Sequence, residues 1–208
     1  VVHLSSAAGL AEVRKARAAG QRHFGVETCT QYLTLTEEAY SDPQEGLKAV
    51  MSPPLRTGAD CEALWGGLAD GSVDAVATDH CPFRFAVEKQ YGVGDFTACP
   101  NGAPGVEERL PVLYSEGVAK GRITLPQLVR LACTEPSRLY GLYPQKGTIQ
   151  PGADADVVIL DPNGTRTLTQ STLHSAADYT CYEGMELQGK IDLVLSHGEV
   201  IVQDNQFL

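Results

Sequence analysis

Strand-like and helix-like segments alternate over the first 77 residues, and this alternation limits the possible folds more than any other feature of the chain. Short runs typical of strands cover residues 1–5, 23–28 and 73–77, and segments typical of helices cover 7–19 and 59–70. Strands that alternate with helices run parallel, with the helices on the faces of their sheet. We therefore predict an α/β fold built on a parallel sheet or barrel.

Two further helices are predicted over residues 106–117 and 125–139. Thr124 can cap the second of these, and Pro126 stands in its first turn, where a proline costs no hydrogen bond. We expect Pro136 to end or kink this helix, because its ring clashes with the carbonyl group four residues earlier.

The carboxyl-terminal part of the chain is rich in strand-like runs. A β-rich run over 155–160 is followed by Asp161-Pro162-Asn163-Gly164, which we expect to end the strand in a turn. Runs over 191–195 and 199–202 flank Ser196-His197-Gly198 and predict a hairpin. This pattern predicts a small all-β, sandwich-like domain.

The change of pattern at Gly147 predicts a domain boundary, with one domain over 1–145 and the sandwich-like domain over 146–208. Within the first domain, residues 82–105 form a long, irregular stretch rich in Gly and Pro. Loops of this length inside a compact domain are uncommon and are often functional.

Composition excludes several classes of partner. The formal net charge of the 208-residue chain is −10, whereas nucleic acids and anionic membranes are bound by clustered Lys and Arg. No apolar stretch approaches the roughly 20 residues of a membrane-spanning helix. We therefore expect no nucleic acid and no membrane among the partners.

The six cysteines are scattered and form no CxxC pair. A disulfide framework is typical of shorter, cysteine-dense secreted chains, so we expect reduced thiols and a cytoplasmic protein. Cys81 and Cys99 lie close to the candidate site and could serve as a nucleophile or as zinc ligands. Neither has a recognisable partner residue, which favours a structural role for both.

The hexapeptide Thr78-Asp79-His80-Cys81-Pro82-Phe83 follows the buried strand predicted over 73–77. It places an acidic residue and a histidine at a strand's carboxyl end, where α/β folds build their sites. The Asp79 carboxylate could bind a metal and accept a proton. The alternative is a helix cap or a surface turn.

His3 stands in an apolar run, where a lone histidine is more often a core residue than a ligand. It nevertheless lies near the end of a strand that should neighbour the strands of Glu27 and Asp79. Imidazole and carboxylate groups at such strand ends can converge on one zinc ion. Two ligands do not complete a catalytic site.

Two loops could hold a small polar ligand through their main chains. Ser52 is fixed by Pro53 and Pro54, and Asn101 stands in a Gly- and Pro-rich loop that leads into a helix. The alternative for both loops is simple turn chemistry.

Seven motifs together resemble the D-hydantoinase and dihydropyrimidinase family of the amidohydrolase superfamily, in family order and with family-like spacing. The Ser-Pro-Pro-Leu-Arg and Pro-Asn-Gly-x-Pro-Gly-Val-Glu segments are the most specific. The seven are Val2-His3-Leu4-Ser5, Glu27-Thr28-Cys29-Thr30-Gln31-Tyr32-Leu33, Met51-Ser52-Pro53-Pro54-Leu55-Arg56, Thr78-Asp79-His80-Cys81-Pro82-Phe83, Pro100-Asn101-Gly102-Ala103-Pro104-Gly105-Val106-Glu107, Lys146-Gly147-Thr148-Ile149 and Tyr182-Glu183-Gly184-Met185.

The resemblance implies a (β/α)8 TIM barrel with two divalent metal ions, usually zinc, and a flanking β-sandwich. It implies that His3 and Asp79 are metal ligands. It also implies that main-chain groups at Ser52 and Asn101 hold a small cyclic amide substrate, and that the full-length protein is a homodimer or homotetramer.

The implied reaction opens a hydantoin or dihydropyrimidine ring to an N-carbamoyl amino acid. A metal-bridged hydroxide would attack the ring carbonyl, and Asp79, the catalytic residue, would pass the proton to the leaving nitrogen. A non-catalytic scaffold protein on the same fold is the alternative, as in the dihydropyrimidinase-related neuronal proteins, which have lost metal ligands. The presence of His3 and Asp79 favours the enzyme.

The family's His-x-His, its carboxylated lysine, a further histidine and an oxyanion-stabilising tyrosine have no counterpart in this sequence. The resemblance therefore predicts a carboxyl-terminal half, covering about strands six to eight of the barrel and part of the sandwich. We expect such a half to be inactive by itself.

Overall fold

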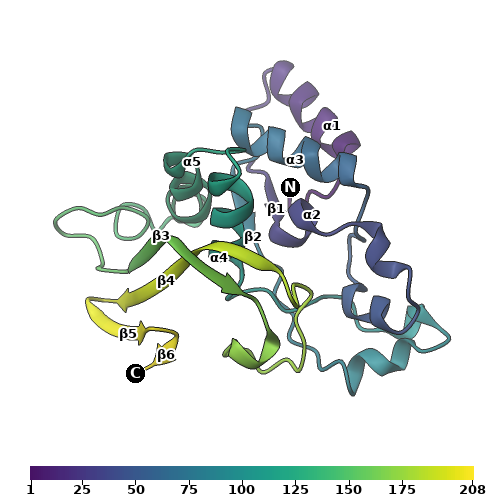
Figure 1. Ribbon diagram of the computed structural model, residues 1–208. Helices are drawn as coiled ribbons and strands as arrows, with labels where there is room; N and C mark the ends of the chain where they lie inside the picture. The colour runs from purple at the N-terminus through teal and green to yellow at the C-terminus, as the bar shows by residue number, and fades with distance from the viewer. The chain divides into compact units, whose positions relative to one another are not determined.

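In the computed structural model, which describes residues 1–208, strands β1 (Glu27–Cys29) and β2 (Ala75–Ala77) pair in parallel (Figure 1). Glu27 lies opposite Ala75 and Cys29 lies opposite Ala77. Helix α3 (Gly58–Asp70) precedes β2, and helix α1 (Ala7–Ala18) packs against α3. The predicted parallel pairing is confirmed for these two strands.

Residues 1–5 were expected to form a strand and do not, and the strand expected over 23–28 begins only at Glu27. The first residues still run beside β1, because Leu4 N–H donates to Glu27 O and Glu27 N–H donates to Val1 O, both at 3.0 Å. Between them His3 has φ = 54°, which interrupts the extended path. The main-chain hydrogen bonding between residues 1–4 and β1 is therefore limited to Glu27, and it is interrupted at His3, the residue predicted to bind metal.

The contact between α1 and α3 is close at Gly67. A Cβ atom at this position would lie 3.0 Å from Leu10 Cδ2 and 3.1 Å from Val73 Cγ2. Leu10, Leu64 and Leu68 are fully buried. The two helices thus form one layer of the core beside the strands that carry the candidate site.

Short helical turns connect the remaining loops of the same unit. They are α2 (Thr30–Thr34), η1 (Glu37–Tyr40), η2 (Glu45–Ala49), η3 (Glu88–Gly92), η4 (Phe96–Ala98) and η7 (Gln170–Thr172). This compact unit comprises Val1–Arg109 and Leu168–Met185, and a second unit comprises Leu110–Thr167 and Glu186–Leu208. The boundary predicted after residue 145 stays a prediction.

The helical part of the second unit begins with α4 (Arg109–Val112) and the π-helical segment η5 (Leu113–Ala119). Helix α5 (Leu125–Val129), π-helical η6 (Arg130–Thr134) and α6 (Glu135–Leu139) follow.

The Thr124 cap is confirmed, since its side chain accepts from Gln127 N–H. Pro136 was expected to end or kink the helix, with a further short helix running to Tyr140, and α6 is that short helix, with Pro136 in its first turn. The wider π turn before it separates the proline ring from the preceding carbonyl groups.

The sheet of the second unit is antiparallel, with strand order β3-β4-β5-β6. Its strands are β3 (Val157–Thr167), β4 (Glu186–Ser196), β5 (Glu199–Gln203) and β6 (Gln206–Phe207). The β4–β5 hairpin is the predicted one, and His197 and Gly198 turn it with φ angles of 50° and 85°.

The turn predicted at Asp161-Pro162-Asn163-Gly164 is wrong. These residues lie inside β3, at an irregularity in the pairing with β4 between Asp161 and Thr165. A bulge leaves residues without ladder partners, so a proline that cannot donate a hydrogen bond is tolerated there.

The helices are all too short or too polar to cross a lipid bilayer.

Candidate active site

His3 and Asp79 face one another, with His3 Nε2 3.9 Å from Asp79 Oδ1. Both backbones are left-handed, with φ angles of 54° and 49°. This conformation is uncommon for residues other than glycine, and it persists where surrounding structure holds it, often at functional sites. The separation exceeds a hydrogen bond, so the two atoms are neighbours without bonding each other.

Glu27 holds the other side of the His3 imidazole. Its Oε1 lies 3.1 Å from His3 Nδ1 and accepts a longer hydrogen bond, at 3.4 Å, from His3 N–H. A carboxylate at Nδ1 favours the tautomer with the proton on that nitrogen. The lone pair of Nε2 is then directed toward Asp79, as a metal ligand requires.

Cys29 completes a group of three possible ligands with His3 and Glu27, whose ligand atoms all lie within 4.8 Å of one another. Its Sγ is 3.6 Å from His3 Nδ1. Burial raises the pKa of this thiol far above its ordinary value, and the charges of Glu27 and Asp79 raise it further. Cys29 is therefore a neutral thiol in this structure, and a thiolate would be needed for strong zinc binding.

The donor set fits a divalent metal ion. The imidazole of His3 and the carboxylate of Asp79 are both groups that zinc accepts as ligands, and Glu27 supplies the hydrogen bond that metal-binding histidines usually make through their other nitrogen. Both predicted ligands are about one-third exposed or less, at 29% for His3 and 30% for Asp79, so the site is open to a small molecule.

Ser52 and Asn101 lie together, as Ser52 O–H donates to Asn101 Oδ1 at 3.3 Å. Both are exposed and line a mostly apolar cavity of about 620 Å³, to which Met51 and Phe96 also contribute. Gly102 N–H donates to Val50 O at 3.0 Å and joins the two loops through their main chains.

Helix α2 connects the two parts of the site. Gln31 Nε2 donates to Thr78 O at 3.0 Å, directly before Asp79. Tyr32 O–H donates to Pro53 O at 2.8 Å, directly after Ser52. Because α2 follows β1 without a break, the strand that begins at Glu27 leads directly into the residues that contact both loops.

His80 orders the Asn101 loop. Its Nδ1 accepts from Gly105 N–H at 3.1 Å and from Val106 N–H at 3.3 Å, so this nitrogen is unprotonated. A bridge between His80 and Ala103 supports the same loop. His80 is thus a neutral structural imidazole beside Asp79.

The sequence placed Glu27 on a strand beside those of His3 and Asp79, but its role as the partner of His3 Nδ1 was not predicted. The available signal was its position on a strand parallel to the strand that precedes Asp79. A carboxylate at such a position can face a neighbouring ligand as well as a metal.

Three comparisons place these observations among known proteins. The model of the amidohydrolase family matches residues 2–201. D-phenylhydantoinase of Escherichia coli O1:K1 is 49% identical over 207 residues, which cover all of this chain and 44% of that protein.

Solved structures agree with this relationship. Dihydropyrimidinase from Brevibacillus agri NCHU1002 superposes with a TM-score of 0.97 at 44% identity, covering all of this chain and 45% of the other. L-hydantoinase (dihydropyrimidinase) from Arthrobacter aurescens gives a TM-score of 0.90 at 34% identity, again covering all of this chain and 45% of the other. The chain spans less than half the length of these relatives, and the match to the family model over almost its entire length shows that it belongs to the amidohydrolase family.

Proposed function

We propose that this chain is the carboxyl-terminal part of a metal-dependent cyclic amidase that opens hydantoin or dihydropyrimidine rings to N-carbamoyl amino acids. The observation that carries the proposal is the approach of His3 Nε2 to 3.9 Å from the Asp79 carboxylate, on two left-handed backbones beside strands β1 and β2. Relatives with the names D-phenylhydantoinase and dihydropyrimidinase support the substrate class.

Two divalent metal ions, most simply zinc, would lower the pKa of the attacking water and polarise the ring carbonyl group. His3 and Asp79 would be the ligands from this chain, and the remaining ligands, including a carboxylated lysine, would come from the rest of the protein. Glu27 would orient His3 through Nδ1.

The chain's own residues would supply positioning and proton transfer. The Asp79 carboxylate would accept the proton of the attacking water and return it to the ring nitrogen as the amide C–N bond breaks and a C–O bond forms. Main-chain groups at Ser52 and Asn101 would hold the cyclic amide, since their loops are tied together beside an open cavity.

The proposal has an architectural side. Strands β1 and β2 would be adjacent strands of a (β/α)8 barrel, within the part that holds about strands six to eight, and residues 146–208 would be a portion of a small β-sandwich. A chain with only these ligands would be inactive alone. The full-length protein would be a cytoplasmic homodimer or homotetramer.

The test is zinc content and ring opening in the full-length protein and in its Asp79→Asn variant. We expect bound zinc and hydantoin hydrolysis in the parent, with both strongly reduced in the variant. A metal-free parent that binds hydantoin without opening it would instead support the non-catalytic scaffold. The retained His3 and Asp79 favour the enzyme.

A further inference from the structure

Lys89 is a fully buried cation in η3, within the long irregular loop that follows Asp79. Its Nζ donates to Val50 O at 2.9 Å and to Pro100 O at 2.8 Å, and it lies 5.9 Å from the centre of the Phe83 ring. Both hydrogen-bond acceptors are main-chain carbonyl oxygens, which carry only partial charge. Burial accordingly lowers the pKa of Lys89.

The two carbonyl groups belong to the loops of the proposed substrate site. Val50 is two residues before Ser52, and Pro100 directly precedes Asn101. Val50 O accepts from both Lys89 and Gly102 N–H, so one ammonium and one amide fix the same carbonyl. Lys89 therefore joins the two loops through one ammonium group.

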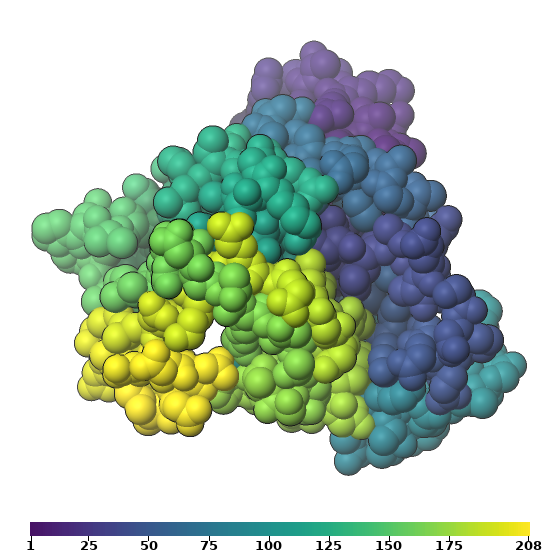
Figure 2. All heavy atoms as spheres, in the orientation of Figure 1, coloured from purple at the N-terminus to yellow at the C-terminus, as the bar shows by residue number.

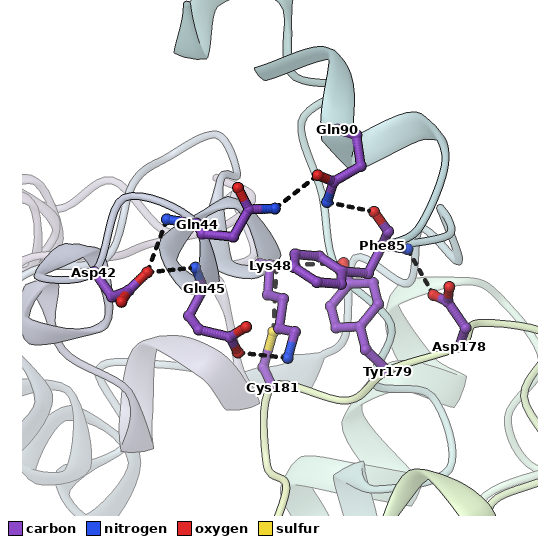
Figure 3. A network of polar contacts seen from close by, with 9 residues as sticks. All are labelled: Asp42, Gln44, Glu45, Lys48, Phe85, Gln90, Asp178, Tyr179 and Cys181. Carbon is purple, nitrogen blue, oxygen red and sulfur yellow. Dashed lines mark hydrogen bonds and ion pairs between the residues drawn. The ribbon is translucent and has the colours of Figure 1, made fainter. Parts of the chain in front are cut away.

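The segment that carries Lys89 is anchored on its other side (Figure 3). Asp178 accepts from Phe85 N–H at 2.6 Å. It also accepts from Ala86 N–H at 3.0 Å. Gln90 Nε2 donates to Phe85 O at 2.8 Å, and Gln44 Nε2 donates to Gln90 Oε1 at 2.6 Å. These contacts leave the backbone of residues 85–90 little freedom to move.

Packing around Lys89 is equally close. A Cβ atom at Gly92 would lie 2.6 Å from Cys99 Cβ and 2.7 Å from Leu47 Cδ2. Figure 2 shows the segments around residues 40–50 and 85–100 lying against each other, and η2 contacts η3. A displacement of Lys89 would therefore be transmitted to the loops that precede Ser52 and Asn101.

An apolar side chain of similar volume would fill the space, but it would remove the donor that Lys89 supplies to Val50 O and Pro100 O. The charge does what an apolar side chain cannot, because it draws two carbonyl dipoles toward one point.

We propose that Lys89 is a positioning residue that holds the main chain at Ser52 and Asn101 at the spacing required to bind the cyclic amide. This inference rests on the proposed function. It predicts an effect on substrate binding that is separate from metal binding, since Lys89 acts through the two loops and not through His3 or Asp79.

The experiment compares Lys89→Met with Lys15→Met in the full-length protein, using 5-phenylhydantoin as the substrate. Lys15 is an exposed residue of α1 whose side chain pairs with Glu12, so it controls for the loss of one charge. We expect Lys89→Met to raise KM about tenfold or more, with kcat and zinc content within about twofold of the parent. Lys15→Met should change none of these values.

The conservative variant Lys89→Arg keeps the charge and the N–H donors, and it should retain a KM closer to that of the parent. If Lys89→Met does not fold, Lys89→Gln carries the same test with one donor group retained. An unchanged KM in the folded variant overturns the inference, as does a loss of zinc that accounts for the whole effect. A parent protein without ring-opening activity instead overturns the proposed function.

Discussion

Replacing Glu27 by Gln tests how strongly the carboxylate supports His3 as a ligand. Gln keeps the shape and an oxygen that can accept from Nδ1–H, so only the negative charge is removed. The two side chains are partly buried, with Glu27 at 14% and His3 at 29% exposure, and their atoms are 3.1 Å apart. Solvent therefore screens this pair less than it screens a surface ion pair.

The magnitude follows from the type of hydrogen bond. A hydrogen bond to a charged group contributes about 1.5–3 kcal/mol and a neutral one about 0.5–1.5 kcal/mol. The difference of about 1–1.5 kcal/mol corresponds to a loss of about five- to tenfold in zinc affinity. Glu27→Ala removes the whole interaction and should approach the roughly 100-fold limit seen for such supporting residues.

The assay is zinc competition with a chromogenic chelator, applied to the full-length protein at neutral pH. Glu12→Gln is the matched control, because it removes the same charge at an α1 residue whose side chain is 73% exposed and pairs with Lys15. Equal zinc affinity in the parent, Glu27→Gln and Glu27→Ala would refute the reasoning. It would mean that the contact with Nδ1 does not influence the metal-binding nitrogen.

Two predictions concern stability. Gly189→Ala should lower the free energy of unfolding by about 2–4 kcal/mol in a denaturant titration, because Gly189 has φ = 91° and a Cβ would lie 2.4 Å from Tyr114 Cδ1; a change below about 0.5 kcal/mol would contradict this close packing. Burial raises the pKa of the Cys181 thiol from 9.0 to about 12. The buried neutral thiol therefore contributes fully to the free energy of unfolding below pH 9. This contribution should be lost as pH rises from 9 toward 12, because the thiol of the unfolded chain ionises first. Between pH 9 and 12, Cys181→Ala should reduce the fall of the free energy of unfolding with pH by at most about 1.4 kcal/mol per pH unit. Identical slopes in the parent and the variant would contradict this prediction.

Locally encoded features were predictable from the sequence. The Thr124 cap depends on two residues three positions apart, and the hairpin around His197 depends on a two-residue turn. A few neighbouring residues of the sequence are therefore enough to predict each of them. The Asp161–Gly164 turn failed for the opposite reason. Pairing with β4 carries the strand through this segment, and a bulge accommodates its turn-forming residues.

Part of the site was also predictable from the sequence. Asp79 follows strand β2, which pairs in parallel with β1, and His3 lies in the extended segment that hydrogen-bonds to β1 at Glu27. Glu27 and Lys89 act through contacts that the local pattern does not contain: the Lys89 ammonium reaches Val50, 39 residues earlier in the chain. The left-handed backbone at His3, which breaks the expected first strand, is likewise absent from the apolar pattern of residues 1–5.

The contacts of the site separate its two tasks. Glu27 touches His3 and no part of the Ser52 or Asn101 loops, whereas Lys89 holds both loops and touches neither predicted ligand. Their variants should therefore differ, one in zinc affinity and the other in KM. Helix α2 serves both tasks, since Gln31 bonds beside Asp79 and Tyr32 bonds beside Ser52. Metal and substrate positions are thus linked through the turn that follows β1, and a shift of that turn would alter both together.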